Sequence, residues 1–172
     1  MKRSWSIFVV AITVVATAIA YEPLSLALFK IKEPYFKYPI RTSGSKMAIR
    51  GDDYGNGEFG SKRSGGRSHT GIDILANIGT PVYASKSGIA FCGNVPTGYG
   101  KYVMVYHPDG SQTMYAHLLE SNIASPKRVR QGDVIGFVGK TGNASANSIQ
   151  PHLHFEIRKR GQPQDPQNLV RK

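Results

Sequence analysis

The feature that most constrains the fold is a series of short apolar runs, rich in β-branched and aromatic residues and cut by glycine. The six clearest runs cover residues 80–85, 88–95, 101–107, 111–118, 133–139 and 152–159. Such runs are typical of strands, and after residue 44 no run of ten or more residues shows the i, i+3, i+4 apolar stripe of a helix. The sequence therefore predicts a mainly β protein, a single antiparallel β-sheet domain with long glycine-rich loops and few short helices. The link "HPDG" predicts a tight hairpin turn between the third and fourth runs.

The length of the chain suits one folded unit preceded by an export segment. A chain of 172 residues can bury one core without disulfide staples. Lys2 and Arg3 precede the apolar run 7–20, which ends in small residues as an export signal does. This run is shorter than the roughly 20 residues that a spanning helix needs, which favours a cleaved signal over a retained membrane anchor.

We therefore expect residues 1–20 to be a signal peptide or membrane anchor, residues 21–44 a linker or arm without sustained period, and residues 45–172 the folded domain. The arm is dense in leucine and aromatic residues, which an exported protein seldom leaves in water. It either packs along the β domain or extends as a tether to the membrane or a partner. The expected location is the periplasm or cell envelope, with or without attachment to the inner membrane through the N-terminal segment.

The net charge and the cysteine content limit the kinds of partner that we expect for this chain. The formal net charge of +11 favours polyanions, and for an exported chain these are envelope polymers and anionic lipid rather than nucleic acid. The single cysteine, Cys92, cannot form an internal disulfide and lies where a small buried hydrophobe is expected. We expect a monomer.

Two of the five histidines lie two residues apart in the last strand-like run. Residues two apart on a strand share a face, so His152 and His154 point one way and Leu153 and Phe155 the other. Two imidazoles on one face of a strand require partners there.

Candidate partners lie upstream in "HTGID", where His69 and Asp73 are four residues apart. On an extended strand their Cα atoms would be about 13 Å apart, so the chain must bend between them if both are to reach one ion. Gly71 tolerates the backbone angles of such a bend and a close approach of the backbone. His117 ends another strand-like run, whereas His107 is expected to be structural or exposed.

These residue types favour catalytic zinc. Two imidazole nitrogens and a carboxylate with the fourth position open are typical of catalytic zinc, whereas a structural site is closed by four ligands, usually with cysteines. A serine or cysteine triad is the rival enzyme chemistry. Ser68 and Cys92 lack the sequence context of a nucleophile elbow or a papain-like cysteine.

The ordered motifs "HTGID", "YAHL" and "HLHFE" resemble the lysostaphin-type (LytM-type) zinc endopeptidases, which cut peptide cross-links of peptidoglycan. The resemblance runs from about Phe59 to Glu156 and includes the glycine-rich spacers between the motifs. It implies a β-sheet domain with a substrate groove whose floor carries one zinc ion per chain.

The resemblance also implies a division of roles. It implies that His69, Asp73 and His154 bind the zinc, and that His117 and His152 are the catalytic histidines beside it. There is no HExxH motif and hence no glutamate base on a ligand-bearing helix. An imidazole, with an ordinary pKa of about 6.5, can accept a proton from water and pass it to the leaving amine. Either histidine can be the base, with the other holding the oxyanion.

Three further residues have open roles. Glu156 either orients a ligand histidine or lies solvated at the end of its strand. Arg67 and Tyr115 flank the ligand motifs and either touch substrate or are structural.

The expected function is that of an exported zinc metalloendopeptidase acting on peptide cross-links of bacterial peptidoglycan during cell-wall remodelling. One alternative is a catalytically inactive envelope-binding or amidase-activating module of the same fold. Another is a carrier-type β domain, suggested by "VRQGDVIGFVG". A carrier domain would need a modifiable lysine at a hairpin tip and has no use for the histidines.

Overall fold

The computed structural model describes residues 21–41 and 47–172. The chain divides into two units, Met1–Pro34 and Tyr35–Lys172. The apolar run 7–20, expected to be a signal peptide or membrane anchor, lies outside the described residues. Within the two described ranges, no helix is both long enough and apolar enough to cross a membrane.

In the first unit, residues 21–32 are helical. The expectation that this segment has no sustained period is wrong. Tyr21, Leu24, Leu28 and Ile31 recur at helical spacing and form an exposed apolar stripe. Apolar residues also stand between the stripe positions, and they obscure the period in the sequence.

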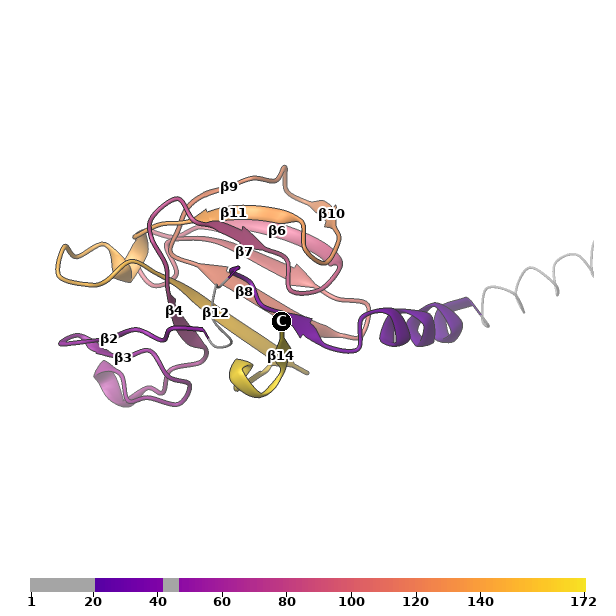
Figure 1. Ribbon diagram of the computed structural model, residues 1–172, viewed down its shortest axis with the longest axis horizontal. Helices are drawn as coiled ribbons and strands as arrows, with labels where there is room; N and C mark the ends of the chain where they lie inside the picture. The colour runs from indigo at the N-terminus through magenta and orange to yellow at the C-terminus, as the bar shows by residue number, and fades with distance from the viewer. Residues whose placement is uncertain (1–20, 42–46) are drawn as a thin grey trace, which may run out of the picture. The chain divides into compact units, whose positions relative to one another are not determined.

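The regular elements described in the second unit are strands and three short 3-10 helices, joined by loops (Figure 1). Its elements are, in chain order, β1 Phe36–Lys37, β2 Gly51–Asp52, β3 Gly55–Asn56, η1 Ser64–Gly66, β4 Ile72–Leu75, β5 Pro81–Tyr83, β6 Gly88–Asn94, β7 Lys101–Tyr106, β8 Ser111–Ala116, β9 Leu118–Ser121, β10 Lys127–Val129, β11 Val134–Val138, η2 Gly142–Ala144, β12 His152–Lys159, β13 Gln162–Gln164, η3 Pro166–Asn168 and β14 Val170–Arg171.

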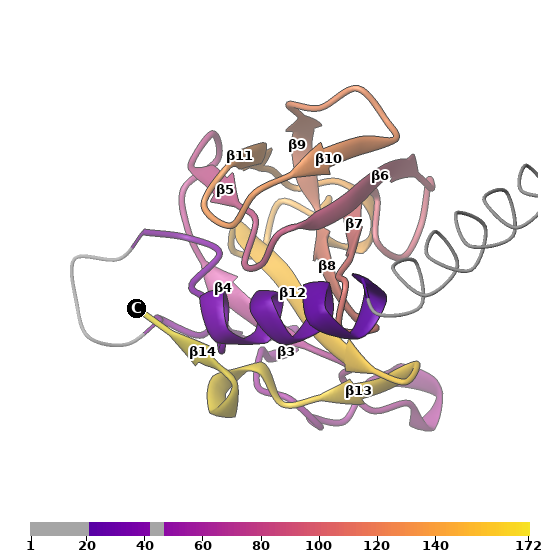
Figure 2. The same cartoon turned by 90° about the vertical axis from the view of Figure 1, so that its right-hand side faces the viewer.

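The strands are divided among several sheets. Seven strands form the main sheet, in the order β10-β6-β7-β8-β12-β13, with β4 also paired to β12. A second sheet has the order β5-β11-β9, and β2 pairs with β3. Every described pairing is antiparallel except the short contact between β1 and β14. Figure 2 shows β5, β9 and β11 together on one side of β4 and β12.

The predicted mainly β fold is confirmed. Each of the six apolar runs contains a strand, namely β5, β6, β7, β8, β11 and β12. The predicted turn at 107–110 joins β7 to β8 as an antiparallel hairpin. Gly110, with a φ of 77°, donates its backbone N–H to the His107 carbonyl at 3.0 Å. Glycine adopts this left-handed conformation without steric cost.

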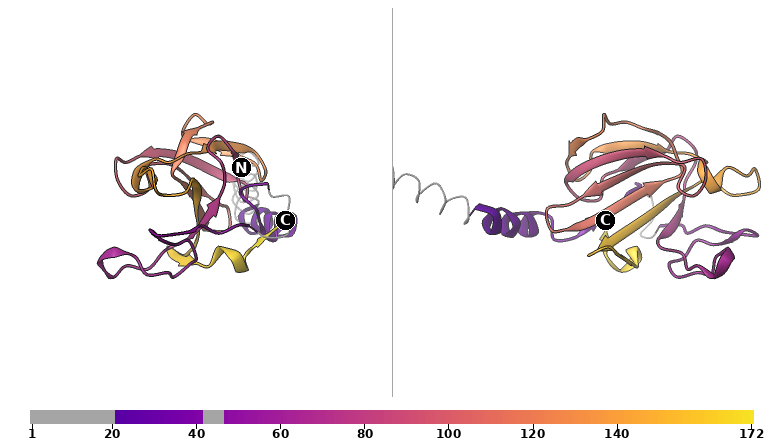
Figure 3. Two further views of the ribbon diagram at one scale, coloured as in Figure 1. Left: turned by 60° about the vertical axis from the view of Figure 1, so that its left-hand side comes forward. Right: turned by 180° about the vertical axis from the view of Figure 1, so that it is seen from behind.

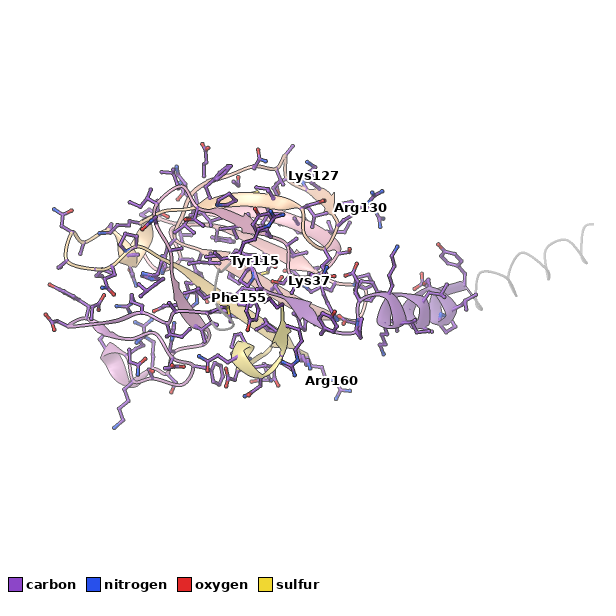
Figure 4. The ribbon with its side chains drawn as sticks, in the orientation of Figure 1. Lys37, Tyr115, Lys127, Arg130, Phe155 and Arg160 are labelled. Carbon is purple, nitrogen blue, oxygen red and sulfur yellow. The ribbon has the colours of Figure 1, made fainter. Side chains whose placement is uncertain are left out.

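One buried cluster joins the main sheet to the second sheet. Val82 of β5 and Ile135 of β11 share it with Val103 of β7, and all three are fully buried. Tyr115 and Phe155, labelled in Figure 4, lie at its centre with ring centroids 5.3 Å apart. Burying side chains of this size stabilises the fold by about 1.5–3 kcal/mol each.

Residues before the predicted domain start at position 45 contribute to this core. Phe36 of β1 pairs with Val170 of β14 and is 4% exposed, and Ile40 is 3% exposed. The boundary at residue 45 stays a prediction about the smallest folding unit. These contacts show that apolar packing of the second unit begins earlier.

A buried cation lies beneath β1. The Lys86 ammonium is 2.8 Å from Asp109 Oδ2 and 4.5 Å from the centroid of the Phe36 ring. Burial alone would raise the pKa of Asp109, but hydrogen bonds from Lys86 and Ser111 outweigh it and hold this pKa at about 2. The ionised form of Asp109 is therefore favoured in the folded protein.

We expect Asp109→Asn to lower the free energy of unfolding by about 2 kcal/mol at pH 7, because the folded pKa lies below the unfolded one. The contribution is fully present above the unfolded pKa of 3.8 and is lost as the pH falls toward 2. Urea titrations of wild type and variant should therefore diverge at neutral pH and converge only as the pH falls through about 2. The exposed carboxyl of Asp53, changed to Asn, is the control. A stability difference that does not change with pH contradicts the assignment.

Candidate metal and active site

The register of β12 brings the candidate ligands together. On one edge His154 pairs directly with Asp73 of β4, and on the other with Ala116 of β8. Directly paired residues share a face of the sheet, so His154 and Asp73 project to the same side. His117 follows Ala116, and its φ of 61° turns the chain from β8 into β9. One strand register thus gathers three of the predicted site residues.

The bend predicted between His69 and Asp73 is present. Gly71 forms a bend immediately before β4 begins at Ile72. A Cβ atom at position 71 would lie 2.3 Å from the Phe155 carbonyl oxygen, which is closer than real Cβ contacts allow. Glycine is therefore required here for a close backbone approach rather than for a positive φ.

Three potential ligand atoms converge on one point. His69 Nε2 lies 3.0 Å from Asp73 Oδ1, His154 Nδ1 lies 2.9 Å from the same oxygen, and the two ring nitrogens are 3.0 Å apart. All three residues are buried. Tetrahedral zinc with bonds of about 2.0–2.2 Å requires neighbouring ligand atoms at separations only slightly larger than these.

The outer ring nitrogens show which tautomers this cluster requires. His69 Nδ1 is 2.9 Å from the Glu58 carbonyl oxygen, and His154 Nε2 is 3.0 Å from Glu156 Oε1. Both contacts are to acceptors, so these nitrogens donate and the inner nitrogens are left with lone pairs. Two lone pairs and a carboxylate oxygen repel one another unless a cation lies between them. The donor set therefore fits a metal ion.

In the metal-free chain a proton supplies that positive charge. Burial would lower the pKa of His154, but hydrogen bonds to Asp73 and Glu156 outweigh burial and raise it to about 9. Burial would likewise raise the pKa of Asp73, but the hydrogen bond from protonated His154, followed by the contact with His69, holds it well below the usual range. A metal binding here would displace the proton of His154.

His117 and His152 stand beside this cluster with matching hydrogen bonds. His117 Nδ1 donates to the Thr141 carbonyl at 2.9 Å, and His152 Nδ1 donates to the Gln150 carbonyl at 2.7 Å. Each ring therefore keeps a lone pair on Nε2. The two ring centroids are 5.1 Å apart. Burial lowers the pKa of His152 and, together with the charge of His154, lowers that of His117 to about 3. Both rings are neutral at pH 7.

All five predicted site residues line one groove with a volume of ≈ 420 Å³. Its walls include the loop around η1 and the loop after η2, which Figures 1 and 3 show at the same end of the second unit. Arg67 also lines the groove, which is where a residue that touches substrate would have to lie. Tyr115 does not, because it is fully buried and its hydroxyl bonds the Ser85 N–H.

The profile of peptidase family M23 matches residues 67–166, more than half of the chain. The chain belongs to peptidase family M23. This result confirms the resemblance to the lysostaphin-type endopeptidases. The matched region contains all five predicted site residues.

Relatives of this M23 domain include two curated bacterial proteins. DD-carboxypeptidase/endopeptidase Mpg of Neisseria meningitidis serogroup B is 48% identical over 104 residues, which are 60% of this chain and 23% of that protein. Peptidoglycan DD-endopeptidase ShyC of Vibrio cholerae is 32% identical over 103 residues, again 60% of this chain and 23% of that protein. The chain thus matches about a quarter of the length of these relatives.

Solved structures agree with the M23 fold. A zinc containing peptidase from Vibrio cholerae has a TM-score of 0.63 at 28% identity, covering 78% of this chain and 40% of that one. The catalytic domain of lysostaphin from Staphylococcus simulans has a TM-score of 0.54 at 32% identity, covering 70% of this chain and 96% of that one.

The sequence motifs do not mark Arg50 and Arg63 of the M23 groove, and they leave the role of the Glu156 carboxylate undecided. Arg50 and Arg63 both line the groove and contact Asp73. Glu156 is fully buried, and its Oε1 also accepts from Tyr99 at 2.8 Å, so it is not a solvated strand-end residue. No local pattern marks these residues, since their partners are distant in the sequence.

His107 has one of the two roles expected of it, whereas Cys92 is less buried than expected. His107 is buried outside the groove, with Nδ1 2.9 Å from the Ser87 carbonyl oxygen and Nε2 3.0 Å from Thr113 Oγ1. Cys92 is half-buried and packs against the core.

We expect Gly71→Ala to destabilise the domain by about 1–3 kcal/mol, since the added methyl group overlaps the Phe155 carbonyl and must push β4 away from β12. Gly51→Ala is the matched control, because a Cβ atom there meets nothing within 4 Å. Chemical denaturation measures both. Equal effects of the two substitutions would show that the approach at position 71 is not constrained.

Proposed function

We propose that the chain is a zinc metalloendopeptidase that hydrolyses peptide cross-links of bacterial peptidoglycan. The observation that carries this proposal is the convergence of His69 Nε2, Asp73 Oδ1 and His154 Nδ1 to within 3.0 Å beside two neutral imidazoles in one groove. Membership of family M23 supports it. The curated names of Mpg and ShyC support an endopeptidase acting on peptidoglycan.

The proposed ligands have fixed orientations. His69, Asp73 and His154 would hold one Zn²⁺ per chain, which when bound polarises a carbonyl and lowers the pKa of water. The Glu58 carbonyl and the Glu156 carboxylate fix the ligand rings through their outer N–H groups. Such outer contacts set the tautomer and the direction of the ligand lone pair.

His117 and His152 are the proposed proton carriers. Each holds its Nδ1 proton on a backbone carbonyl and presents Nε2 as an acceptor. A neutral imidazole can take the proton of the attacking water and deliver it to the leaving amine nitrogen. Between these two transfers that ring carries the proton on Nε2, from which it can donate to the oxyanion of the tetrahedral intermediate. Because both rings show the same tautomer, we assign these two steps to the pair.

The groove suits an acidic peptide. Arg63 and Arg67 line it together with Tyr99 and Asn143, so its walls combine positive charge with hydrogen-bonding groups. Peptidoglycan stem peptides carry free carboxylates, which guanidinium groups bind with good geometry. The net charge of +11 favours approach to an anionic envelope polymer.

The proposed place of action is the cell envelope, reached by export and with the protein acting as a monomer. One relative, 33% identical over 109 residues, is named lipoprotein NlpD/LppB homolog of Pseudomonas aeruginosa, and its name supports this place of action. The rival function, an inactive binding or amidase-activating module, does not require the ligand set and both catalytic histidines. All five residues are present in this chain.

Metal analysis tests the ligand set. The purified chain should contain about one zinc ion, and Asp73→Ala should lose it, because two imidazoles alone bind zinc weakly. Inductively coupled plasma mass spectrometry measures the content. Asp53→Ala removes an exposed carboxylate and should keep the metal. Zinc retained in full by Asp73→Ala contradicts the ligand set.

His117→Ala and His152→Ala should each keep the zinc yet lower turnover on purified peptidoglycan by about 10²-fold or more, the usual size of an acid–base contribution. Mass spectrometry of released muropeptides measures the rate and identifies the bond that is cut. His107→Gln, outside the groove, should retain the rate per folded molecule. Wild-type turnover by either alanine variant removes that histidine from the mechanism, and absence of turnover in the zinc-loaded wild type supports the inactive module.

A further inference from the structure

A buried guanidinium links two acidic residues at the edge of the site. Arg50, which is 6% exposed, directs Nη1 to Asp52 Oδ1 at 2.5 Å. Its Nε and Nη2 lie 3.3 and 3.1 Å from Asp73 Oδ2. Arg50 therefore forks around the oxygen of Asp73 that does not face the imidazoles.

A second guanidinium, that of Arg63, contacts the same oxygen of Asp73. Arg63 Nη2 is 3.1 Å from Asp73 Oδ2, while Arg63 Nη1 donates to the Asn56 carbonyl at 2.8 Å. The two carboxylate oxygens of Asp73 are thus divided: Oδ2 belongs to the arginines and Oδ1 to the histidine cluster. Because a carboxylate is planar, fixing Oδ2 fixes the direction of Oδ1.

The same contacts continue to a proposed catalytic histidine. Asp52 Oδ2 accepts from the Gln150 N–H at 3.2 Å, and the Gln150 carbonyl accepts from His152 Nδ1 at 2.7 Å. An unbroken series of polar contacts therefore runs from Asp73 through Arg50, Asp52 and Gln150 to His152. Of these residues, Arg50 and Asp52 lie outside the region that matches family M23.

The chemistry of arginine suits such a brace. The planar guanidinium holds a carboxylate at two points, whereas a lysine ammonium is a point charge with freely rotating donors. A buried ion pair contributes little net stability compared with apolar packing, so stability alone is a weak reason for placing Arg50 here. Orientation of the carboxylate is a stronger reason, since supporting contacts of a metal ligand typically change metal affinity by about 10–100-fold.

We propose that Arg50, with Asp52 and Arg63, is a positioning group that holds Asp73 Oδ1 toward the metal cluster and couples this orientation to His152. The proposal rests on the proposed zinc site for its effect on metal affinity. Its effect on the orientation of Asp73 and His152 does not depend on metal or on peptidase activity.

The test compares Arg50→Lys with Arg130→Lys in the full chain. Both substitutions keep the charge. Arg130, labelled in Figure 4, is exposed, directly follows β10 and does not line the groove. Zinc affinity is measured by competition with a chromogenic chelator, and the ring ¹⁵N shifts of the histidines are measured in metal-free protein. Arg63→Lys is a second variant at a more exposed position, with 21% side-chain exposure, should Arg50→Lys fail to fold.

We expect Arg50→Lys to weaken zinc binding by about 10–100-fold and to shift the ring ¹⁵N signals of His152 and His154, with Arg130→Lys changing neither. In the background of Asp73→Asn, Arg50→Lys should add little further loss of zinc affinity, because coupled residues are not additive.

An unchanged zinc affinity together with unchanged ¹⁵N signals in a folded Arg50→Lys variant overturns the proposal. If the wild type binds zinc but cleaves no peptidoglycan, the proposed function fails while both readouts still test the brace. If the wild type binds no zinc, the ¹⁵N signals alone decide.

Discussion

The two-residue period of β12 is the constraint on which the rest of the site depends. Its apolar face, Leu153, Phe155 and Ile157, is fully buried in the core. Its other face carries His152, His154 and Glu156, which are also buried. Because β4 and β8 pair with its two edges, a slip of one residue would place imidazoles in the core and leucine in the groove. The register is therefore strongly specified, and it determines that Asp73 is the partner of His154.

A polar face that is buried must have its hydrogen bonds satisfied, or each unpaired group costs several kcal/mol. Here the loops supply the acceptors. Backbone carbonyls of Glu58, Thr141 and Gln150 each take one imidazole N–H. Each of these bonds fixes a tautomer and turns the opposite nitrogen toward the groove. The loops thus determine the chemistry of the rings as well as the walls of the groove.

Local patterns were sufficient to predict much of this arrangement. Strand period and glycine spacing predict β5 to β8, β11 and β12, and the short motifs contain the whole predicted ligand set. The contacts made by Arg50 and Arg63 with Asp73 join residues 23 and 10 positions apart, and nothing local distinguishes these two from the other basic residues. The hydrogen bond of buried Glu156 with Tyr99 likewise joins residues 57 positions apart. Such features arise from tertiary packing and cannot be read from a window of sequence.

The charged neighbours of Asp73 explain how a carboxylate can stay ionised in a buried site. Burial disfavours the charged form of Asp73, and an uncompensated carboxylate would take up a proton and cease to be a metal ligand. The contacts of Oδ1 with His154 and His69 outweigh this cost and lower the pKa of Asp73, while two guanidinium groups contact Oδ2 without occupying Oδ1. Asp73 therefore stays ionised in its buried position. The motifs thus carry both the proposed ligands and the imidazoles that keep Asp73 ionised, and the segment before the M23 match adds the two arginines that contact Oδ2.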